Sequence, residues 1–128
     1  MTIRRAHLIF FVSNQRQAAA FYGALLKKNP LLDVPGMTEF ELSDQLILGL
    51  MPRSGAARLL SLPLQNPEQP GAPTGELYLY CEDPEETFQH AITCGAIAVS
   101  EVALRNWGDW AGYVADPDGH VLAFARKN

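Results

Sequence analysis

Apolar residues follow two different periods in the first fifty positions. Ala6–Val12 is a short run rich in Ile, Phe and Val, a composition typical of a buried strand. Between residues 18 and 26 the apolar positions recur at the spacing of one helical face, and Asn14 precedes them as an N-cap. Two further strands are expected at residues 38–42 and 45–51, joined by a tight turn. The pattern therefore predicts a strand, a helix and then further strands.

The stretch from residue 52 to residue 75 breaks this pattern. Between its ends, Pro52 and Gly75, it contains two glycines and four prolines, and proline removes a backbone donor and disrupts helix and sheet ladders. These residues are Gly55, Pro63, Pro67, Pro70, Gly71 and Pro73. We expect a connection with little continuous helix, containing a short strand near residues 59–64.

The second half of the chain repeats the order of the first. Residues 76–82 alternate apolar and polar positions as a strand does. Asp83, Pro84 and Glu86 combine an N-cap, a first-turn proline and a capping glutamate, which predicts a helix start, and Gly95 predicts its end. Strands are expected at residues 97–102, 110–115 and 120–125. The last two are joined by residues 116–119, whose composition favours a type I turn.

Superposing the halves aligns His7 with Glu76 and Asn14 with Asp83, and each pair is separated by the same seven-residue interval. Either half alone would leave one face of an open sheet unburied. Packing one half against the other removes that exposed surface, so the duplication has a physical purpose.

In three segments the sequence resembles the vicinal oxygen chelate superfamily, which includes glyoxalases, bleomycin resistance proteins and extradiol dioxygenases. These segments are the opening strand from His7 to Val12, the pair Phe21 and Tyr22, and the Asp-Pro-Asp-Gly-His run from Asp116 to His120. The resemblance implies an α+β fold of two βαβββ modules that form a cupped, barrel-like mixed sheet with helices outside. It implies one domain over residues 1–128, with module 1 at about 5–52, a linker at about 53–74 and module 2 at about 75–127.

Composition and charge restrict the class of partner. The chain has 128 residues, of which 48% are hydrophobic, and this suits a single domain with its own core. Its net charge is -4 and its lysines and arginines are scattered, which argues against a nucleic-acid or anionic-membrane partner. Cys81 and Cys94 lack metal-type spacing and suit a reducing compartment. The first apolar run is too short to span a membrane. We expect a cytoplasmic protein.

The resemblance also implies where a metal would bind. Metal-dependent members place four ligands on the first and last strands of the two modules, and these positions match His7, Gly49, Glu76 and Ala123. His7 and Glu76 could bind Zn, Mn, Fe or Ni, whereas glycine and alanine have no donor atom. We therefore expect no tightly bound cofactor. The alternative is a divalent metal held by His7 and Glu76.

Strand alternation predicts which side chains share a face with these four positions. Ile9 and Phe11 should accompany His7, and Trp110, Gly112 and Val114 should face inward if the last hairpin closes symmetrically about its turn. The expected cup is apolar and aromatic, as organic-ligand pockets are, with Gly49, Gly112 and Ala123 leaving volume in it. The predicted pocket residues are Phe11, Ile47, Gly49, Met51, Tyr78, Tyr80, Trp107, Trp110 and Ala123.

The two polar residues of the cup admit more than one interpretation. If His7 and Glu76 meet, the carboxylate favours the imidazolium and the pair can act as catalytic acid and base. His7 could equally be a strand histidine bonded to a carbonyl group, and Glu76 a solvated carboxylate at a strand end.

Three functions follow from these features. The first is a small-molecule-binding protein of the glyoxalase/bleomycin-resistance type that sequesters a hydrophobic or aromatic ligand without a tightly bound metal. The second is a metal-dependent lyase, isomerase or dioxygenase using His7 and Glu76, so the pattern leaves open whether the chain is an enzyme. The third is a dimeric interaction module without small-molecule chemistry. A homodimer is implied by the resemblance.

Overall fold

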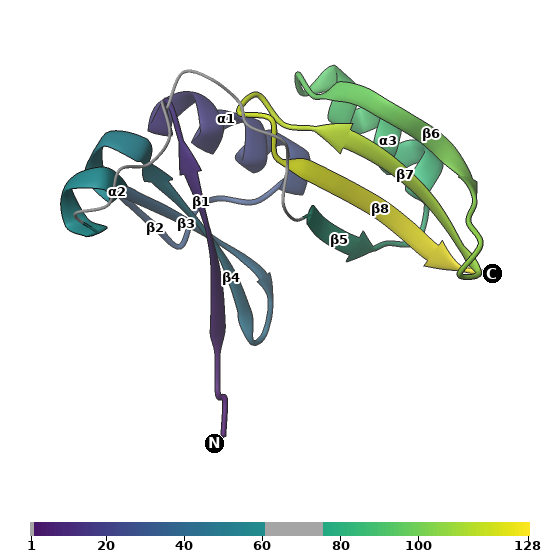
Figure 1. Cartoon of the computed structure of the whole chain (residues 1–128), viewed down its shortest axis with the longest axis horizontal. Helices are drawn as coiled ribbons and strands as arrows, with labels where there is room; N and C mark the ends of the chain where they lie inside the picture. Colours follow the sequence, from purple (N-terminus) through teal and green to yellow (C-terminus); the bar gives the residue numbers. More distant parts are fainter. Residues whose placement is uncertain (1, 61–75) are drawn as a thin grey trace. The chain divides into compact units, whose positions relative to one another are not determined.

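The computed structural model describes residues 2–60 and 76–128, with the side chains of residues 57–60 left aside (Figure 1). The chain divides into two compact units, Met1–Gly71 and Ala72–Asn128. Each unit carries one four-stranded mixed sheet with a helix packed on it. The α+β class and the two βαβββ modules are confirmed. That the two modules form a single domain stays a prediction.

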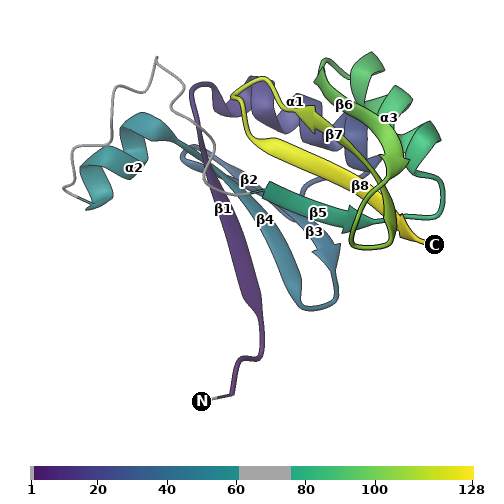
Figure 2. The same cartoon turned by 45° about the vertical axis from the view of Figure 1, so that its right-hand side comes forward.

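The first unit follows the predicted order with one additional strand (Figure 2). Its sheet has the order β1-β4-β3-β2, in which β1 runs parallel to β4 and the other neighbours are antiparallel. The elements are β1 (Ala6–Val12), α1 (Gln15–Leu26), β2 (Leu32–Val34), β3 (Met37–Ser43) and β4 (Leu46–Pro52).

Helix α1 begins and ends for local chemical reasons. The Asn14 side chain accepts a hydrogen bond of 2.9 Å from the Gln17 backbone N–H, as an N-cap does. The helix ends at Lys27, a left-handed residue with φ of 55°. Its buried residues are Ala18, Phe21, Tyr22 and Leu25, which are the positions expected from the pattern. This apolar stripe packs α1 on β3 and β4.

Strand β2 was not predicted, because three residues are too few to show an alternating pattern. Gln15 fastens it to the start of α1. The Gln15 amide donates to the Val34 carbonyl at 2.8 Å and to the Thr38 hydroxyl at 2.9 Å, and it accepts from the Gly36 N–H at 2.9 Å. One side chain therefore supplies the polar contacts that hold this turn.

The expectation of little helix after residue 52 is wrong in its first part. Helix α2 (Arg53–Leu60) follows β4 directly, so positions 59 and 60 of the expected strand are helical. The prolines that prevent a helix begin only at residue 63, and residues 53–60 contain none. The remainder of the expected strand, residues 61–64, lies outside the described residues.

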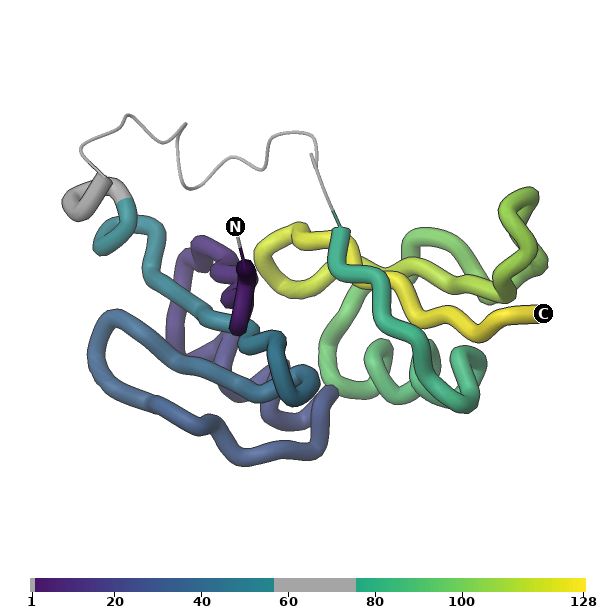
Figure 3. The backbone as a smooth tube through the Cα atoms, turned by 90° about the horizontal axis from the view of Figure 1, so that it is seen from below, coloured from purple at the N-terminus to yellow at the C-terminus, as the bar shows by residue number. Residues whose placement is uncertain are grey.

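The second unit repeats the topology of the first, with strand order β5-β8-β7-β6 and β5 parallel to β8. Figure 3 shows the last strand, in yellow, returning beside the first strand of its unit. The elements are β5 (Glu76–Tyr80), α3 (Pro84–Thr93), β6 (Ile97–Leu104), β7 (Asp109–Ala115) and β8 (Val121–Lys127). The predicted repeat is thus confirmed strand by strand.

Helix α3 is capped as predicted and packs closely on its sheet. The Asp83 carboxylate accepts from the Glu86 N–H at 3.0 Å. A Cβ added at Gly112 on β7 would lie 3.0 Å from Phe88 of the helix and 2.6 Å from the Val102 side chain. Glycine is therefore required where helix and sheet meet.

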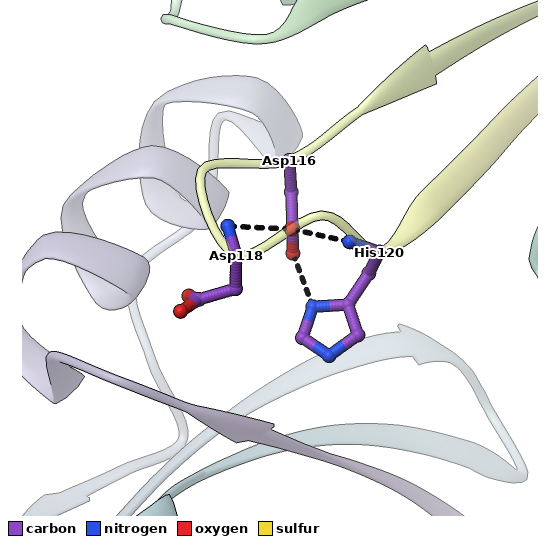
Figure 4. A network of polar contacts seen from close by, with 3 residues as sticks. All are labelled: Asp116, Asp118 and His120. Atoms are coloured by element: carbon purple, nitrogen blue, oxygen red, sulfur yellow. Dashed lines mark hydrogen bonds and ion pairs between the residues drawn. The ribbon is translucent and has the colours of Figure 1, made fainter. Parts of the chain in front are cut away.

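The β7–β8 loop is held by one buried carboxylate (Figure 4). Asp116 accepts from the backbone N–H groups of Asp118 at 2.9 Å and His120 at 2.8 Å, and its second oxygen lies 2.8 Å from His120 Nδ1. Ala115 pairs with Val121, so five residues separate the strands and not the four assumed from the turn motif. A shift of one residue in register moves every side chain to the other face.

No helix in the described part of the chain is long and apolar enough to cross a membrane.

Candidate functional site

Each sheet has one face covered by its own helix, and we call the opposite one its far face. On the first sheet Phe10 packs toward Tyr22 of α1, so its neighbours in β1 lie on the far face. The register of β1 and β4 adds three residues of β4 to that face. The residues so placed are His7, Ile9, Phe11, Ile47, Gly49 and Met51, which confirms the predicted sharing of faces.

His7 has a partner that the pattern did not reveal. Its Nδ1 lies 3.4 Å from a carboxylate oxygen of Glu39 on β3, and both side chains are partly exposed. Thr38 and Phe40 are fully buried, so Glu39 lies between two residues that face the helix. Alternation within β3 therefore places Glu39 on the far face, whereas its approach to His7 depends on the order of the strands, which has no local pattern.

Gly49 does not leave the volume expected of it. A Cβ at this position would lie 3.1 Å from Ile9 Cγ1 and 3.2 Å from Met37 Sδ. These side chains already fill the space above the glycine, so the expectation of a cavity there is wrong. The physical reason is that neighbouring strands supply side chains large enough to close the gap.

On the far face of the second sheet, aromatic residues lie beside small ones. Register places Tyr78 beside Ala123 and Tyr113, and Tyr80 beside Ala125 and Ala111. Glu76 lies on the same face at the exposed start of β5. The face therefore has tyrosines on β5 and β7 with alanines on β8 between them.

The expectation that Trp110, Gly112 and Val114 share this face is wrong. The five-residue loop places all three on the face that α3 covers. The Trp110 ring lies 5.4 Å from the Arg126 guanidinium, which in turn binds Glu85 of α3 at 2.7 Å. Gly112 is occupied by close contacts and leaves no open volume.

Three aromatic side chains and one carboxylate form a network on the far face of the second sheet. The hydroxyls of Tyr78 and Tyr80 donate to the same oxygen of Asp109, at 2.8 and 2.7 Å. The Trp107 indole N–H donates to the Tyr78 hydroxyl at 3.0 Å. The two tyrosine rings meet edge to face with centroids 5.4 Å apart. We call Tyr78, Tyr80 and Trp107, held by Asp109, the aromatic platform.

The platform depends on the alanines beneath it. The tyrosines start on β5 and reach Asp109 on β7, so their rings must pass over β8, which lies between the two strands. On this face β8 presents Ala123 and Ala125, and both are fully buried. Only small residues on β8 leave room for the rings to cross it.

The network shifts the acid strengths of its members. Hydrogen bonds from Tyr80 and then Tyr78 lower the pKa of Asp109 below its ordinary value, because they stabilise the carboxylate. Burial raises the pKa of Tyr78, and the neighbouring Asp109 carboxylate adds to that effect. Both groups are thus held in the states that the network needs at neutral pH: an ionised acceptor and a protonated donor.

Two cations lie against tyrosine rings of this face. Lys127 Nζ lies 5.0 Å from the centre of the Tyr80 ring, and the Arg105 guanidinium lies 5.1 Å from that of Tyr113. Arg105 also donates to the Ala111 carbonyl and to the Ser100 hydroxyl, each at 3.0 Å. Its position is therefore fixed by the strands on either side.

A metal would find an incomplete set of donors at the positions implied by the resemblance. Gly49 shares the far face with His7, and Ala123 shares one with Glu76, but neither provides a ligand atom. Among the described residues no group of three His, Cys, Asp or Glu side chains could hold an ion. His7 and Glu76 belong to different units, so their pairing stays a prediction.

A groove in the first unit was not anticipated. It has a volume of about 720 Å³ and lies between α1 and the segment that leads into β2. Its wall on the helix consists largely of small residues, and its charged lining residues are Arg16, Lys28 and Asp33. Small residues on a helix carry little pattern of their own, which explains why the groove could not be predicted.

Comparison with known proteins gives structural matches only. No protein-family model and no curated protein matches the chain. A glyoxalase-related enzyme from Fulvimarina pelagi is 19% identical with a TM-score of 0.83, over 94% of this chain and 85% of that one. A glyoxalase/bleomycin resistance protein/dioxygenase family enzyme from Burkholderia phytofirmans is 13% identical with a TM-score of 0.83, over 95% and 97%.

Protein ATC0852 from Agrobacterium tumefaciens is 27% identical with a TM-score of 0.78, over 100% of this chain and 99% of that one. These matches extend over both units and agree with the duplicated βαβββ topology. The resemblance drawn from the sequence is confirmed at the level of the fold: the chain shares its fold with solved structures described as a glyoxalase-related enzyme and as a glyoxalase/bleomycin resistance protein/dioxygenase family enzyme.

Proposed function

We propose that the protein binds a hydrophobic or aromatic small molecule on the aromatic platform and does so without a tightly bound metal. The observation that carries this proposal is the network in which Asp109 holds Tyr78 and Tyr80 while Trp107 bonds to Tyr78. Every polar atom that orients these rings has a partner, so a ligand would meet them already in place.

The platform has the exposure that a stacking surface needs. Tyr80 is 56% exposed and Trp107 57% exposed, although large aromatic side chains are usually well covered. Their hydrogen bonds restrict the rotamers of both side chains, and this lowers the entropy that a ligand would otherwise have to offset on binding. The binding role follows from exposed rings that are fixed in orientation before any ligand arrives.

The donor set supports the absence of a tightly bound metal from this role. His7 and Glu76 provide two ligand atoms where the metal-dependent pattern has four, and Gly49 and Ala123 add none. Binding of an organic ligand to the platform needs no ion.

A ligand screen by thermal unfolding tests the proposal, with Trp107 fluorescence as a second signal. The chain has two tryptophans, so Trp110→Phe leaves Trp107 as the reporter and also serves as the matched control on the opposite face. We expect aromatic compounds to raise the midpoint and change Trp107 emission. Tyr80→Ala should weaken binding about tenfold, since one stacked ring is lost.

Two results would count against the proposal. One is a screen in which no aromatic compound stabilises the protein. The other is binding that persists unchanged in both Tyr80→Ala and Trp107→Ala while circular dichroism shows each variant folded.

The second candidate is a metal-dependent lyase, isomerase or dioxygenase that uses His7 and Glu76. The proximity of Glu39 to His7 favours it, because a carboxylate beside an imidazole can orient the ring or add an oxygen donor. The solved neighbours from Fulvimarina pelagi and Burkholderia phytofirmans, which carry the fold, are described as enzymes.

Elemental analysis of protein purified without chelators distinguishes the two candidates. The enzyme predicts stoichiometric metal that is lost in His7→Ala and retained in His90→Ala, a histidine on α3. The binding protein predicts no stoichiometric metal in any of the three.

We also propose a cytoplasmic homodimer with no nucleic-acid or membrane partner. The scattered basic residues support the absence of a nucleic-acid or membrane partner, and the two free thiols, Cys81 and Cys94, support the cytoplasmic location.

A further inference from the structure

We infer that the preferred ligand of the aromatic platform is a planar aromatic ring bearing an anionic group, which stacks on Tyr80 and Trp107 and forms an ion pair with Lys127. This inference rests on the proposed function, because it specifies the ligand class for the same surface. The charged side chains around the platform carry the argument.

Lys127 is the charged side chain that touches an exposed ring of the platform. Its Nζ lies 5.0 Å from the Tyr80 ring centre, and the residue itself is exposed. It pairs across the strands with Asp109, so its amine stands beside the anchored end of the tyrosines. An anionic group on a ligand stacked against Tyr80 would therefore meet an accessible ammonium group.

The negative charge nearest to this site is not accessible in the same way. Asp109 is 5% exposed, and one of its oxygens already accepts from both tyrosine hydroxyls. A ligand cation would have to compete with these donors and also take the place that Lys127 holds on the Tyr80 ring. The carboxylate anchors the platform and is influenced by the charge of Lys127, whereas the exposed ammonium group can also meet a ligand.

The remaining charges of the far face stand at the other end of the platform. Arg105 covers Tyr113 and is fixed by bonds to Ala111 and Ser100, and Glu76 acts on the same tyrosine. Arg105 thus supplies a positive charge near Tyr113, while Glu76 and Asp109 supply negative charges there. Lys127 is therefore the charged group that we expect to determine which ligand charge is preferred at Tyr80.

Three probes with the same ring and different charge test this inference: indoleacetate, tryptophol and tryptamine, which are anionic, neutral and cationic. Their affinities are measured by titration calorimetry on the full chain at neutral pH. We expect indoleacetate to bind about fivefold more tightly than tryptophol, the ratio of one partly exposed ion pair. Tryptamine should bind more weakly than tryptophol, and the advantage of indoleacetate should shrink in high salt.

Lys127→Met keeps the aliphatic chain and removes the charge, so it should abolish the difference between the indoleacetate and tryptophol affinities, both measured in that variant. Arg126→Met is the matched control, because Arg126 is the neighbouring cation but faces α3 and pairs with Glu85. That variant should keep the preference for indoleacetate.

The outcomes separate this inference from the function on which it rests. If none of the three probes binds, and none of the screened aromatic compounds does, the proposed binding function fails. If the three bind equally, or tryptamine binds best, the platform is a binding surface and the preference for an anion is overturned. Loss of the preference in Arg126→Met but not in Lys127→Met would overturn it as well.

Discussion

Asp109 is a buried residue that orients the side chains of an exposed surface. Its side chain is 5% exposed, yet it determines the orientation of two rings, one of which is more than half exposed. Hydrogen bonds to an ionised acceptor are stronger than neutral ones, which explains why a carboxylate suits this position. The consequence is a strong dependence of the platform on the charge of one buried group.

Asp109→Asn tests that dependence. The pKa of Asp109 is lowered in the folded protein, so its stabilising effect is complete above the ordinary value of 3.8 and disappears as pH falls through the lower folded value. We expect Asp109→Asn to lower the unfolding midpoint at pH 7 by about 4 °C. The difference from the wild type should close in acid below pH 3.8.

Thermal unfolding followed by circular dichroism from neutral to acid pH makes the measurement. A midpoint difference of constant size at every pH would show that the carboxylate charge has no part in the network.

Single residues of the site were predicted unevenly from the sequence. Tyr78, Tyr80 and His7 follow from strand alternation, because a period of two assigns each residue to a face without knowing its neighbours. Glu39 and Asp109 were missed because their roles depend on pairings between strands that are far apart in sequence. Such contacts have no local pattern.

At the scale of elements, register explains the one large error in the site. The chain before Val121 was expected to close with a four-residue turn, and the actual loop has five residues because Asp116 binds two backbone N–H groups and His120. The motif predicts that a turn exists but not its length. Helices α1 and α3 and the long strands were predicted well, since their patterns repeat several times, whereas α2 was missed.

Asp116→Ala should destabilise the protein more than most surface changes, by about 3 kcal/mol, because it leaves two N–H groups and an imidazole without this acceptor. Chemical denaturation measures the free energy of unfolding. Asp118→Ala, which keeps the backbone N–H that Asp116 binds, is the control and should change that free energy much less. Equal losses in the two variants would contradict the anchoring role.

Replacing Gly112 or Gly49 by alanine should reduce the free energy of unfolding by different amounts. Gly112→Ala places a Cβ 2.6 Å from Val102 Cγ2 and 3.1 Å from its backbone nitrogen, and it should cost about 2 kcal/mol through overpacking. Gly49→Ala meets only the Ile9 and Met37 side chains at 3.1 and 3.2 Å, which can move, so its cost should be smaller. Denaturant unfolding of the two variants side by side gives the comparison. A larger loss at Gly49 would refute it.

For the whole molecule, the duplication was the most secure prediction. His7 and Glu76 aligned the halves in the sequence, and in the structure His7 is the second residue of β1 and Glu76 the first of β5, in two sheets of equal strand order. Each sheet needs a partner surface, so two units in one chain are physically economical. Oligomeric state has no comparable signal, because an interface need not be periodic.

The proposed homodimer makes a direct prediction at this scale. Light scattering coupled to size exclusion should give twice the mass of one chain at micromolar concentrations. Indoleacetate titration should then show one site per chain, since each chain carries its own platform. A mass equal to that of a single chain across the whole concentration range would exclude the dimer.

Substituting the buried alanines of β8, which lie under the tyrosine rings, would change which ligands the platform binds. A ligand resting on the tyrosine rings would touch neither Ala123 nor Ala125, yet these residues set how close the rings lie to the sheet. A valine at either position would tilt or lift a ring and so change the shape offered to a ligand. Selectivity could therefore be engineered through positions that a scan of ligand contacts would overlook.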